Sequence, residues 1–310
     1  MLRRKFYKTL TDWRKNKKRE CLLVKGARQT GKTFIIDLFG RENYGSYIYI
    51  NFFEEPRLKN VFEGSLSAAE IYKRLSVFFG DIHFKEKDTL IFLDEIQECP
   101  NARTALKFLA EDDRYDVIAS GSLLGINYKE VASFPVGYEK QTELHSLDFE
   151  EFLWAVGVGD EAISYVRTFF DSREKVPPEI NERMMGYLRE YMAVGGMPAV
   201  VNGYVGAKHF GTVHEEQTKI LDAYLEDIAK YAAMSEKPKA KTVICPSPNS
   251  LPRKTKNSNS PLWKAEAERA NTKTASNGCA TPTSCASAIT FPFPNSLSPL
   301  TKNPTNSRYT

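Results

Sequence analysis

The sequence predicts an α/β fold in which helices cover both faces of a parallel five-stranded sheet, a three-layer sandwich. One observation and one general rule predict it. Between residues 20 and 147, apolar runs rich in β-branched and aromatic residues alternate with segments of helical spacing. Strands that are separated by helices pair in parallel. Only helical patterns follow in residues 148–235, which indicates a second, helical domain that we expect to act as a lid.

Residues 1–19 are expected to form an amphipathic basic helix. Leu2, Phe6, Leu10 and Trp13 recur at the spacing of one helical face, and nine Lys and Arg residues surround them. This pattern fits a helix that docks on the domain with its basic face in solvent. It also fits a surface that contacts the phosphates of DNA or RNA. The sequence leaves both interpretations open.

The α/β segment divides into five strands and three intervening helices. Residues 89–93 (TLIFL) form a continuous apolar run, which is typical of a strand buried on both faces. Ser67 stands where it would cap the second of these helices. The expected strands are residues 21–25, 46–53, 89–93, 115–120 and 141–147, and the expected helices are 33–39, 68–79 and 101–110.

Four helices are expected in the helical region, at residues 148–156, 160–170, 178–194 and about 208–233, with a break at Gly195-Gly196-Met197-Pro198. Residues 236–310 differ in composition. From residue 242 onward Ser, Thr, Asn and Pro dominate, and no Asp occurs. Such a segment buries too little apolar surface to offset the entropy of ordering, so we expect it to be disordered. A natural tail and an out-of-frame translation both explain this composition.

Charge and composition exclude several classes of protein. The net charge of +4 comes from residues 242–310, which hold eight basic and two acidic residues, while residues 1–241 hold 35 basic and 37 acidic ones. No stretch of about 18 apolar residues occurs, so a transmembrane helix is not expected. The five cysteines form no CxxC pair, and the basic N-terminus is not followed by an apolar run. These features predict a cytoplasmic protein without disulfides or a zinc module.

The strongest functional signal is a loop that fits G-x-x-x-x-G-K-[ST], between the first strand and the first helix of the α/β segment. Its backbone N–H groups and the following helix N-terminus would hold the phosphates of ATP. Lys32 would reach the β- and γ-phosphates, and the Thr33 hydroxyl would bind Mg²⁺. The predicted nucleotide-binding residues in this loop are Gly26, Ala27, Arg28, Gln29, Thr30, Gly31, Lys32 and Thr33.

A pair of acidic residues follows the apolar strand at residues 89–93. Asp94 is then expected at the carboxyl edge of the sheet beside the loop, where it would help to hold Mg²⁺. Glu95 would orient or deprotonate the water that attacks the γ-phosphate. Ser120, at the end of the fourth strand, would sense that phosphate, although a plain strand-to-loop turn explains it nearly as well. The predicted catalytic residues are thus Lys32, Glu95 and Ser120.

With these motifs, the segments ASGSLL, LHSLDFEEFL and YMAVGGMPAVV occur in an order that resembles a group of bacterial and archaeal ATPases of the AAA superfamily. This resemblance implies a sheet in which the fifth expected strand is followed by the first, fourth, third and second. It also implies hydrolysis through Glu95. Relatives often carry Gly-Arg where this chain has Gly137-Tyr138, so the resemblance does not identify an arginine that acts on the γ-phosphate. Alternative candidates are Arg28, Arg103, Arg114, Arg167 and Arg189.

The sequence therefore predicts an AAA-type ATPase that binds ATP and Mg²⁺ and couples hydrolysis to movement of the helical lid. Three alternatives stay open: a nucleotide-gated switch with little turnover, a P-loop kinase, and a DNA-associated ATPase. The resemblance also implies a winged-helix and nuclease-like region after about residue 241, which the observed composition does not support. A DNA or protein partner and an oligomer are both compatible with the residues, and a membrane is not expected.

Overall fold

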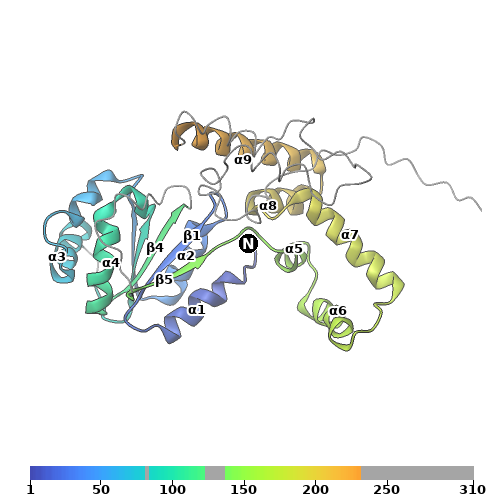
Figure 1. Cartoon of the computed structure of the whole chain (residues 1–310), viewed down its shortest axis with the longest axis horizontal. Helices are drawn as coiled ribbons and strands as arrows, with labels where there is room; N and C mark the ends of the chain where they lie inside the picture. The colour runs from blue at the N-terminus through green and yellow to red at the C-terminus, as the bar shows by residue number, and fades with distance from the viewer. Residues whose placement is uncertain (81–83, 123–136, 232–310) are drawn as a thin grey trace, which may run out of the picture.

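The computed structural model describes residues 1–80, 84–122 and 137–231 (Figure 1). Its centre is a five-stranded sheet in the order β2-β3-β4-β1-β5, and all four neighbouring pairs are parallel. The predicted strand order and the edge position of the second strand are confirmed. The strands are β1 (Cys21–Gly26), β2 (Ser46–Asn51), β3 (Thr89–Asp94), β4 (Asp116–Ser122) and β5 (Glu139–Glu143).

Helices cover the two faces of this sheet, so the predicted three layers are confirmed. Successive residues of β1 alternate between the layers, because side chains in a strand point to opposite faces. Leu22 and Val24 pack in the core with α1 (Phe6–Asn16) and α2 (Lys32–Asn43). Cys21 and Leu23 pack in the opposite core, with α3 (Ala68–Phe79) and α4 (Pro100–Asp112). Two short 3-10 helices, Pro56–Phe62 and Ile96–Glu98, follow β2 and β3.

The N-terminal helix α1 docks on the domain, as one of the two interpretations predicted. Phe6, Leu10 and Trp13 are 8%, 0% and 1% exposed, and all three belong to the core that α2 shares. The helix begins at Phe6 and not at Leu2, so residues 1–5 precede it as a lead outside the helix. These lead residues reach the helical region, as described below.

The helical region contains α5 (Phe149–Ala155), α6 (Asp160–Ser172), α7 (Pro178–Val194), α8 (Pro198–Ala207) and α9 (Phe210–Tyr231). The helix α8 was not predicted from the sequence. Its two glycines and its β-branched residues disfavour a helix locally, and the helix is stabilised by burial of Val200, Val201 and Tyr204 against α5 and α7. In Figure 1, α9 extends above the α/β domain, on the side where β1 leads into α2.

Two further expectations need correction. Ser67 occupies the N-cap position of α3, but its hydroxyl does not cap the helix and accepts a hydrogen bond from Ser65 instead. The strand β5 ends at Glu143, four residues earlier than expected, where its pairing with β1 ends at Lys25. The predictions for residues 236–310 lie outside the described residues. Within the described ranges, no helix has the length and apolar character that a membrane span requires.

Candidate nucleotide-binding site

The glycine-rich loop lies between β1 and α2 at the carboxyl edge of the sheet, as predicted. Gly31 has φ of 88°, a conformation that side chains with a β-carbon disfavour. Gly26 is required for a different reason. A β-carbon at Gly26 would lie 2.4 Å from the Leu144 carbonyl oxygen, so only glycine lets the loop pass the segment that follows β5.

Lys32 folds back onto its own loop. Its Nζ donates hydrogen bonds to the carbonyl oxygens of Gly26 (3.1 Å) and Ala27 (2.7 Å), and the residue is 7% exposed. Burial lowers the pKa of Lys32 from its ordinary value of 10.5, while the carboxylates of Glu95 and Asp94 act in the opposite direction. A desolvated ammonium that donates to backbone carbonyls could donate the same hydrogen bonds to phosphate oxygens instead.

Asp94 is the centre of a polar cluster at the end of β3, and it is 2% exposed. Its Oδ2 accepts hydrogen bonds from the hydroxyls of Thr33 (2.8 Å) and Tyr49 (3.1 Å). Its Oδ1 accepts from the Ser120 hydroxyl and from the backbone N–H of Glu95 (3.0 Å). The structure therefore brings together four predicted residues from three separate segments of the chain.

Tyr49 was not identified from the sequence. It lies on the edge strand β2, where β-sheet pairing places it opposite Phe92, two residues before Asp94. Its hydroxyl also accepts a hydrogen bond of 3.1 Å from the Asn51 amide. A tyrosine in a strand is ordinarily a packing residue, so only the tertiary pairing of β2 with β3 reveals this contact.

Glu95 directly follows β3 in a left-handed backbone conformation, with φ of 52°. Such a conformation is uncommon for residues other than glycine, and it is frequent at functional sites. The Glu95 carboxylate accepts a hydrogen bond from the Gln97 amide. Gln97 was also missed, because a glutamine two residues after a carboxylate carries no sequence signal of its own.

The residues present fit a magnesium ion. Mg²⁺ is commonly held by one or two protein oxygens together with phosphate oxygens and water. The Thr33 hydroxyl and the Asp94 carboxylate supply such oxygens, 2.8 Å apart. In the described part of the chain, no group of three or more His, Cys, Asp or Glu residues is placed to hold a metal by itself.

The helical region also reaches the loop. The Tyr224 hydroxyl on α9 donates a hydrogen bond of 2.9 Å to the Arg28 carbonyl. Pro198 of α8 lies 3.8 Å from the position that a β-carbon on Gly31 would occupy. Both contacts join residues that are more than 150 positions apart in the sequence.

Three of the five candidate arginines have partners elsewhere in the structure. Arg103 and Glu139 form a buried ion pair at 2.5 Å, with side chains 4% and 3% exposed. Arg114 pairs with Asp112, and its guanidinium lies over the ring of Tyr72. Arg167 pairs with Glu150 on α5. The geometry thus gives these three arginines structural contacts, and Arg28 and Arg189 stay candidates.

Several known proteins are similar to this chain. Residues 18–153 match the family model described as an AAA domain. An uncharacterised protein of Methanocaldococcus jannaschii is 27% identical over 179 residues, which cover 57% of this chain and 35% of that protein. The chain thus spans about a third of the length of that relative.

Similar solved structures include a Walker-type ATPase of Pyrococcus abyssi, with 16% identity, 79% of each chain covered and a TM-score of 0.47. Another is AMPPCP-bound DnaA from Aquifex aeolicus, with 14% identity, 94% of this chain and 83% of that chain covered, and a TM-score of 0.42. The ORC1 protein of Aeropyrum pernix in complex with DNA has 12% identity, 86% and 81% coverage, and a TM-score of 0.33.

Proposed function

We propose that this chain binds ATP with Mg²⁺ and hydrolyses the γ-phosphate bond, as the match of residues 18–153 to the AAA domain model suggests. One observation carries the proposal. The Asp94 carboxylate contacts the Thr33 hydroxyl directly, with Glu95 as the next residue and Lys32 buried beside both. This arrangement unites a phosphate-binding loop, two oxygens suited to Mg²⁺ and a candidate base.

Binding begins at the loop. Lys32 transfers its hydrogen bonds from the carbonyls of Gly26 and Ala27 to the phosphates, and the N–H groups at the start of α2 complete the cradle. Thr33 and Asp94 would hold the magnesium ion, which neutralises charge on the phosphates. The other backbone N–H groups of residues 26–33 would donate to the β-phosphate.

Glu95 is the proposed general base. The Gln97 amide holds its carboxylate, and the left-handed turn at Glu95 directs the chain away from the end of β3. A carboxylate in this position can accept the proton of the attacking water. Ser120 donates to Asp94, so its proposed role as a sensor requires its hydroxyl to exchange Asp94 for the γ-phosphate.

The alternative is a nucleotide-gated switch with little turnover. The Gln97 contact favours it, because a carboxylate that accepts this hydrogen bond is a weaker base toward the attacking water. Steady-state phosphate release from wild type and Glu95→Gln separates the two functions. We expect the variant to retain ATP binding and to lose a factor of about 10²–10⁴ in turnover. Equal rates would remove Glu95 from hydrolysis and support the switch.

Lys32→Ala tests binding itself. The substitution removes a desolvated ammonium and the loop's only lysine, so ATP affinity should become undetectable while the melting temperature stays close to that of wild type. ATP affinity that persists in this variant would contradict the phosphate-cradle assignment. Isothermal calorimetry with ATP and Mg²⁺, paired with thermal melts, provides both readouts.

We further propose that residues 148–231 act as a lid, because Tyr224 and Pro198 contact the loop from α9 and α8. Association with DNA is a second candidate function. Lys8, Lys15, Lys18 and Arg19 on or beside α1 are exposed, which favours a basic surface. DNA affinity that falls steeply with salt and is lost on charge reversal of these four residues would support it. Affinity that survives the reversal would contradict it.

A further inference from the structure

Arg4 joins three parts of the molecule that are distant in the sequence. Its guanidinium donates to the Thr30 carbonyl in the glycine-rich loop (Nη1, 3.0 Å) and to the His145 carbonyl after β5 (Nη2, 2.6 Å). Its Nε donates to Glu151 Oε2 on α5 (3.2 Å). The Arg4 and Glu151 side chains are 10% and 6% exposed, so this ion pair is largely shielded from water.

The contact with Thr30 acts on a phosphate-binding group. The peptide bond between Thr30 and Gly31 is planar and trans, so its C=O and N–H point in opposite directions. By holding the carbonyl on one side, Arg4 fixes the direction of the Gly31 N–H on the other. A positively charged partner on the carbonyl also strengthens the hydrogen bond that this N–H can donate. The left-handed conformation of Gly31, with φ of 88°, continues the same turn.

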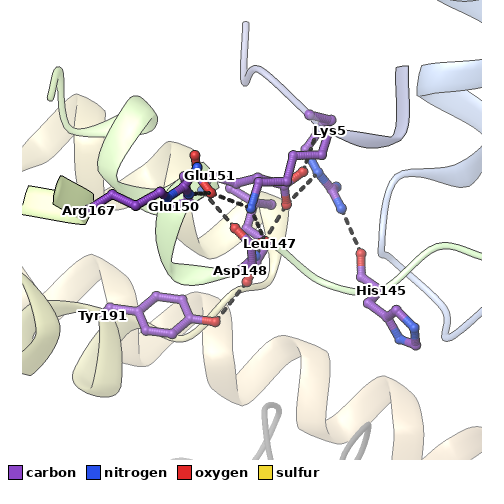
Figure 2. A network of polar contacts seen from close by, with 9 residues as sticks. Lys5, His145, Leu147, Asp148, Glu150, Glu151, Arg167 and Tyr191 are labelled. Atoms are coloured by element: carbon purple, nitrogen blue, oxygen red, sulfur yellow. Dashed lines mark hydrogen bonds and ion pairs between the residues drawn. The ribbon is translucent and has the colours of Figure 1, made fainter. Parts of the chain in front are cut away.

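The contact with Glu151 ties Arg4 to the helical region. Glu151 is held from three directions: its carboxylate also accepts from the backbone N–H of Lys5 (2.6 Å) and of Asp148 (3.2 Å). In return, Asp148 accepts from the Glu151 backbone N–H at 2.8 Å, which completes a capping box at the start of α5. Figure 2 shows Lys5, Asp148 and Glu151 in one network, with His145 at its far end.

We propose that Arg4 is a positioning residue for the nucleotide phosphates, and that the Arg4–Glu151 ion pair makes phosphate affinity depend on the placement of α5. The inference rests on the proposed ATP binding. It gives the residues before α1 a function of their own. Neither docking of α1 on the domain nor a DNA-binding surface would require that function. In this role Arg4 acts through the Thr30–Gly31 peptide, whose carbonyl it holds.

The matched control is Arg3. It pairs with Asp160 at 2.7 Å, with side chains 60% and 59% exposed, and its guanidinium lies 4.0 Å from the ring centre of Trp154 on α5. Arg3 thus contacts the helical region as Arg4 does, but none of these contacts reaches the glycine-rich loop, and an exposed ion pair contributes little. We would measure binding of ATP with Mg²⁺, and of tripolyphosphate, which presents phosphates without a base. The proteins are the full chain and its Arg4→Ala, Arg4→Lys and Arg3→Ala variants.

Arg4→Ala should weaken the binding of ATP and of tripolyphosphate by about tenfold or more, since a charge-assisted hydrogen bond is lost. Arg4→Lys should recover part of the affinity, because an ammonium can bind the Thr30 carbonyl without reproducing all three contacts. Arg3→Ala should stay within about twofold of wild type. If Arg4→Ala lowers the melting temperature yet leaves both affinities unchanged, Arg4 is only a structural contact and the proposal is overturned.

A double-mutant cycle tests the link to α5. If Glu151 acts through Arg4, Glu151→Gln should weaken tripolyphosphate binding, and the double variant should be no weaker than Arg4→Ala. Additive losses would overturn the coupling. Lys32→Ala keeps the two proposals distinguishable. If the wild type binds ATP, Lys32→Ala abolishes this binding and Arg4→Ala leaves it intact, only the inference about Arg4 is refuted. If the wild type binds no ATP, the proposed function and the inference about Arg4 are both refuted.

Discussion

The hydroxyl of Tyr224, on α9, donates a hydrogen bond of 2.9 Å to the carbonyl of Arg28 in the glycine-rich loop. The two residues are 196 positions apart, and this contact joins the helical region to the edge of the α/β domain where the proposed site lies. Movement of α9 away from the loop therefore has to break it. The contact gives the proposed lid a definite place of attachment.

Tyr224→Phe should loosen this attachment. A neutral hydrogen bond of this kind contributes about 0.5–1.5 kcal/mol, and its loss should raise local opening of the loop several-fold. Amide hydrogen exchange at residues 26–31, measured without nucleotide, should accelerate in the variant. Tyr187→Phe on α7, whose hydroxyl contacts only a nearby arginine among the hydrogen bonds described, serves as the control. Unchanged loop exchange in Tyr224→Phe would argue against the attachment.

Tyr49→Phe should raise the concentration of Mg²⁺ needed for half-maximal ATP binding. The Tyr49 hydroxyl donates to the same Asp94 oxygen as Thr33, so it orients the carboxylate that we propose as a magnesium ligand. Burial raises the pKa of Tyr49, so the hydroxyl stays protonated across the neutral range. Loss of this hydrogen bond, worth about 1 kcal/mol, corresponds to a roughly fivefold increase in the Mg²⁺ concentration needed for half-maximal binding.

A magnesium titration at saturating ATP measures this shift. Tyr7→Phe removes a hydroxyl that contacts Glu42 on the surface, away from the loop, and should leave the titration unchanged. A Tyr49→Phe titration that overlays that of wild type would show that Tyr49 only packs against Phe92. The two variants thus separate a positioning role from a general effect of removing a tyrosine hydroxyl.

Lys17, just after α1, connects this helix to the start of β4. Its ammonium contacts Asp113 (2.8 Å) and the buried Asp116 (3.0 Å), and Asp116 also accepts from the Tyr44 hydroxyl (2.6 Å). Although burial acts against it, the two carboxylates raise the pKa of Lys17 above 10.5. Burial likewise opposes the shift at Asp113, but hydrogen bonds from Lys17 and Lys87 hold its pKa below 3.8.

These shifts determine a pH window for stability. The contribution of Lys17 is complete below pH 10.5 and is lost as the pH rises through its folded-state pKa. The contribution of Asp113 is present above pH 3.8 and is lost as the pH falls through its lowered pKa. Lys17→Met should cost about 1.5–3 kcal/mol in urea unfolding at pH 7, and less once the pH has risen through the folded-state pKa of Lys17. A cost that is independent of pH would refute the charge-based account.

Gly196→Ala should disrupt the attachment of the helical region. A β-carbon there would lie 2.2 Å from the Leu147 carbonyl oxygen, while Leu147 N–H donates to the Gly196 carbonyl at 2.7 Å. The backbones can only approach so closely without a side chain between them. We expect a loss of several kcal/mol of stability. Gly186→Ala, in the middle of α7 with open space around it, should instead stabilise by about 0.5–1 kcal/mol.

Thermal melts of the two glycine variants provide the comparison. The two substitutions should change the melting temperature in opposite directions, although each adds one methyl group to a glycine of the same helical region. Similar melting temperatures for the two variants would show that the approach of Gly196 to Leu147 does not limit the packing of α5 against α7 and α8.

Much of the α/β domain could be predicted from local sequence. The apolar run at 89–93 forms β3, all of whose residues are buried, and the glycines and the lysine of the loop from Gly26 to Thr33 stand in an order that identifies it. The strand order came from the resemblance and not from the residues themselves. The helix α8 was missed, since it is stabilised by burial of Val200, Val201 and Tyr204 and not by local propensity.

The glycine-rich loop, the acidic pair at Asp94 and Glu95, and the change from strands to helices can all be predicted from residues that are close along the chain. Only the tertiary structure decided which distant groups meet them. Tyr49 reaches Asp94 through strand pairing, Arg4 reaches Thr30 and Glu151 through docking of α1, and Tyr224 reaches Arg28 through the position of α9. Such contacts follow from the packing of whole elements, which no single segment encodes.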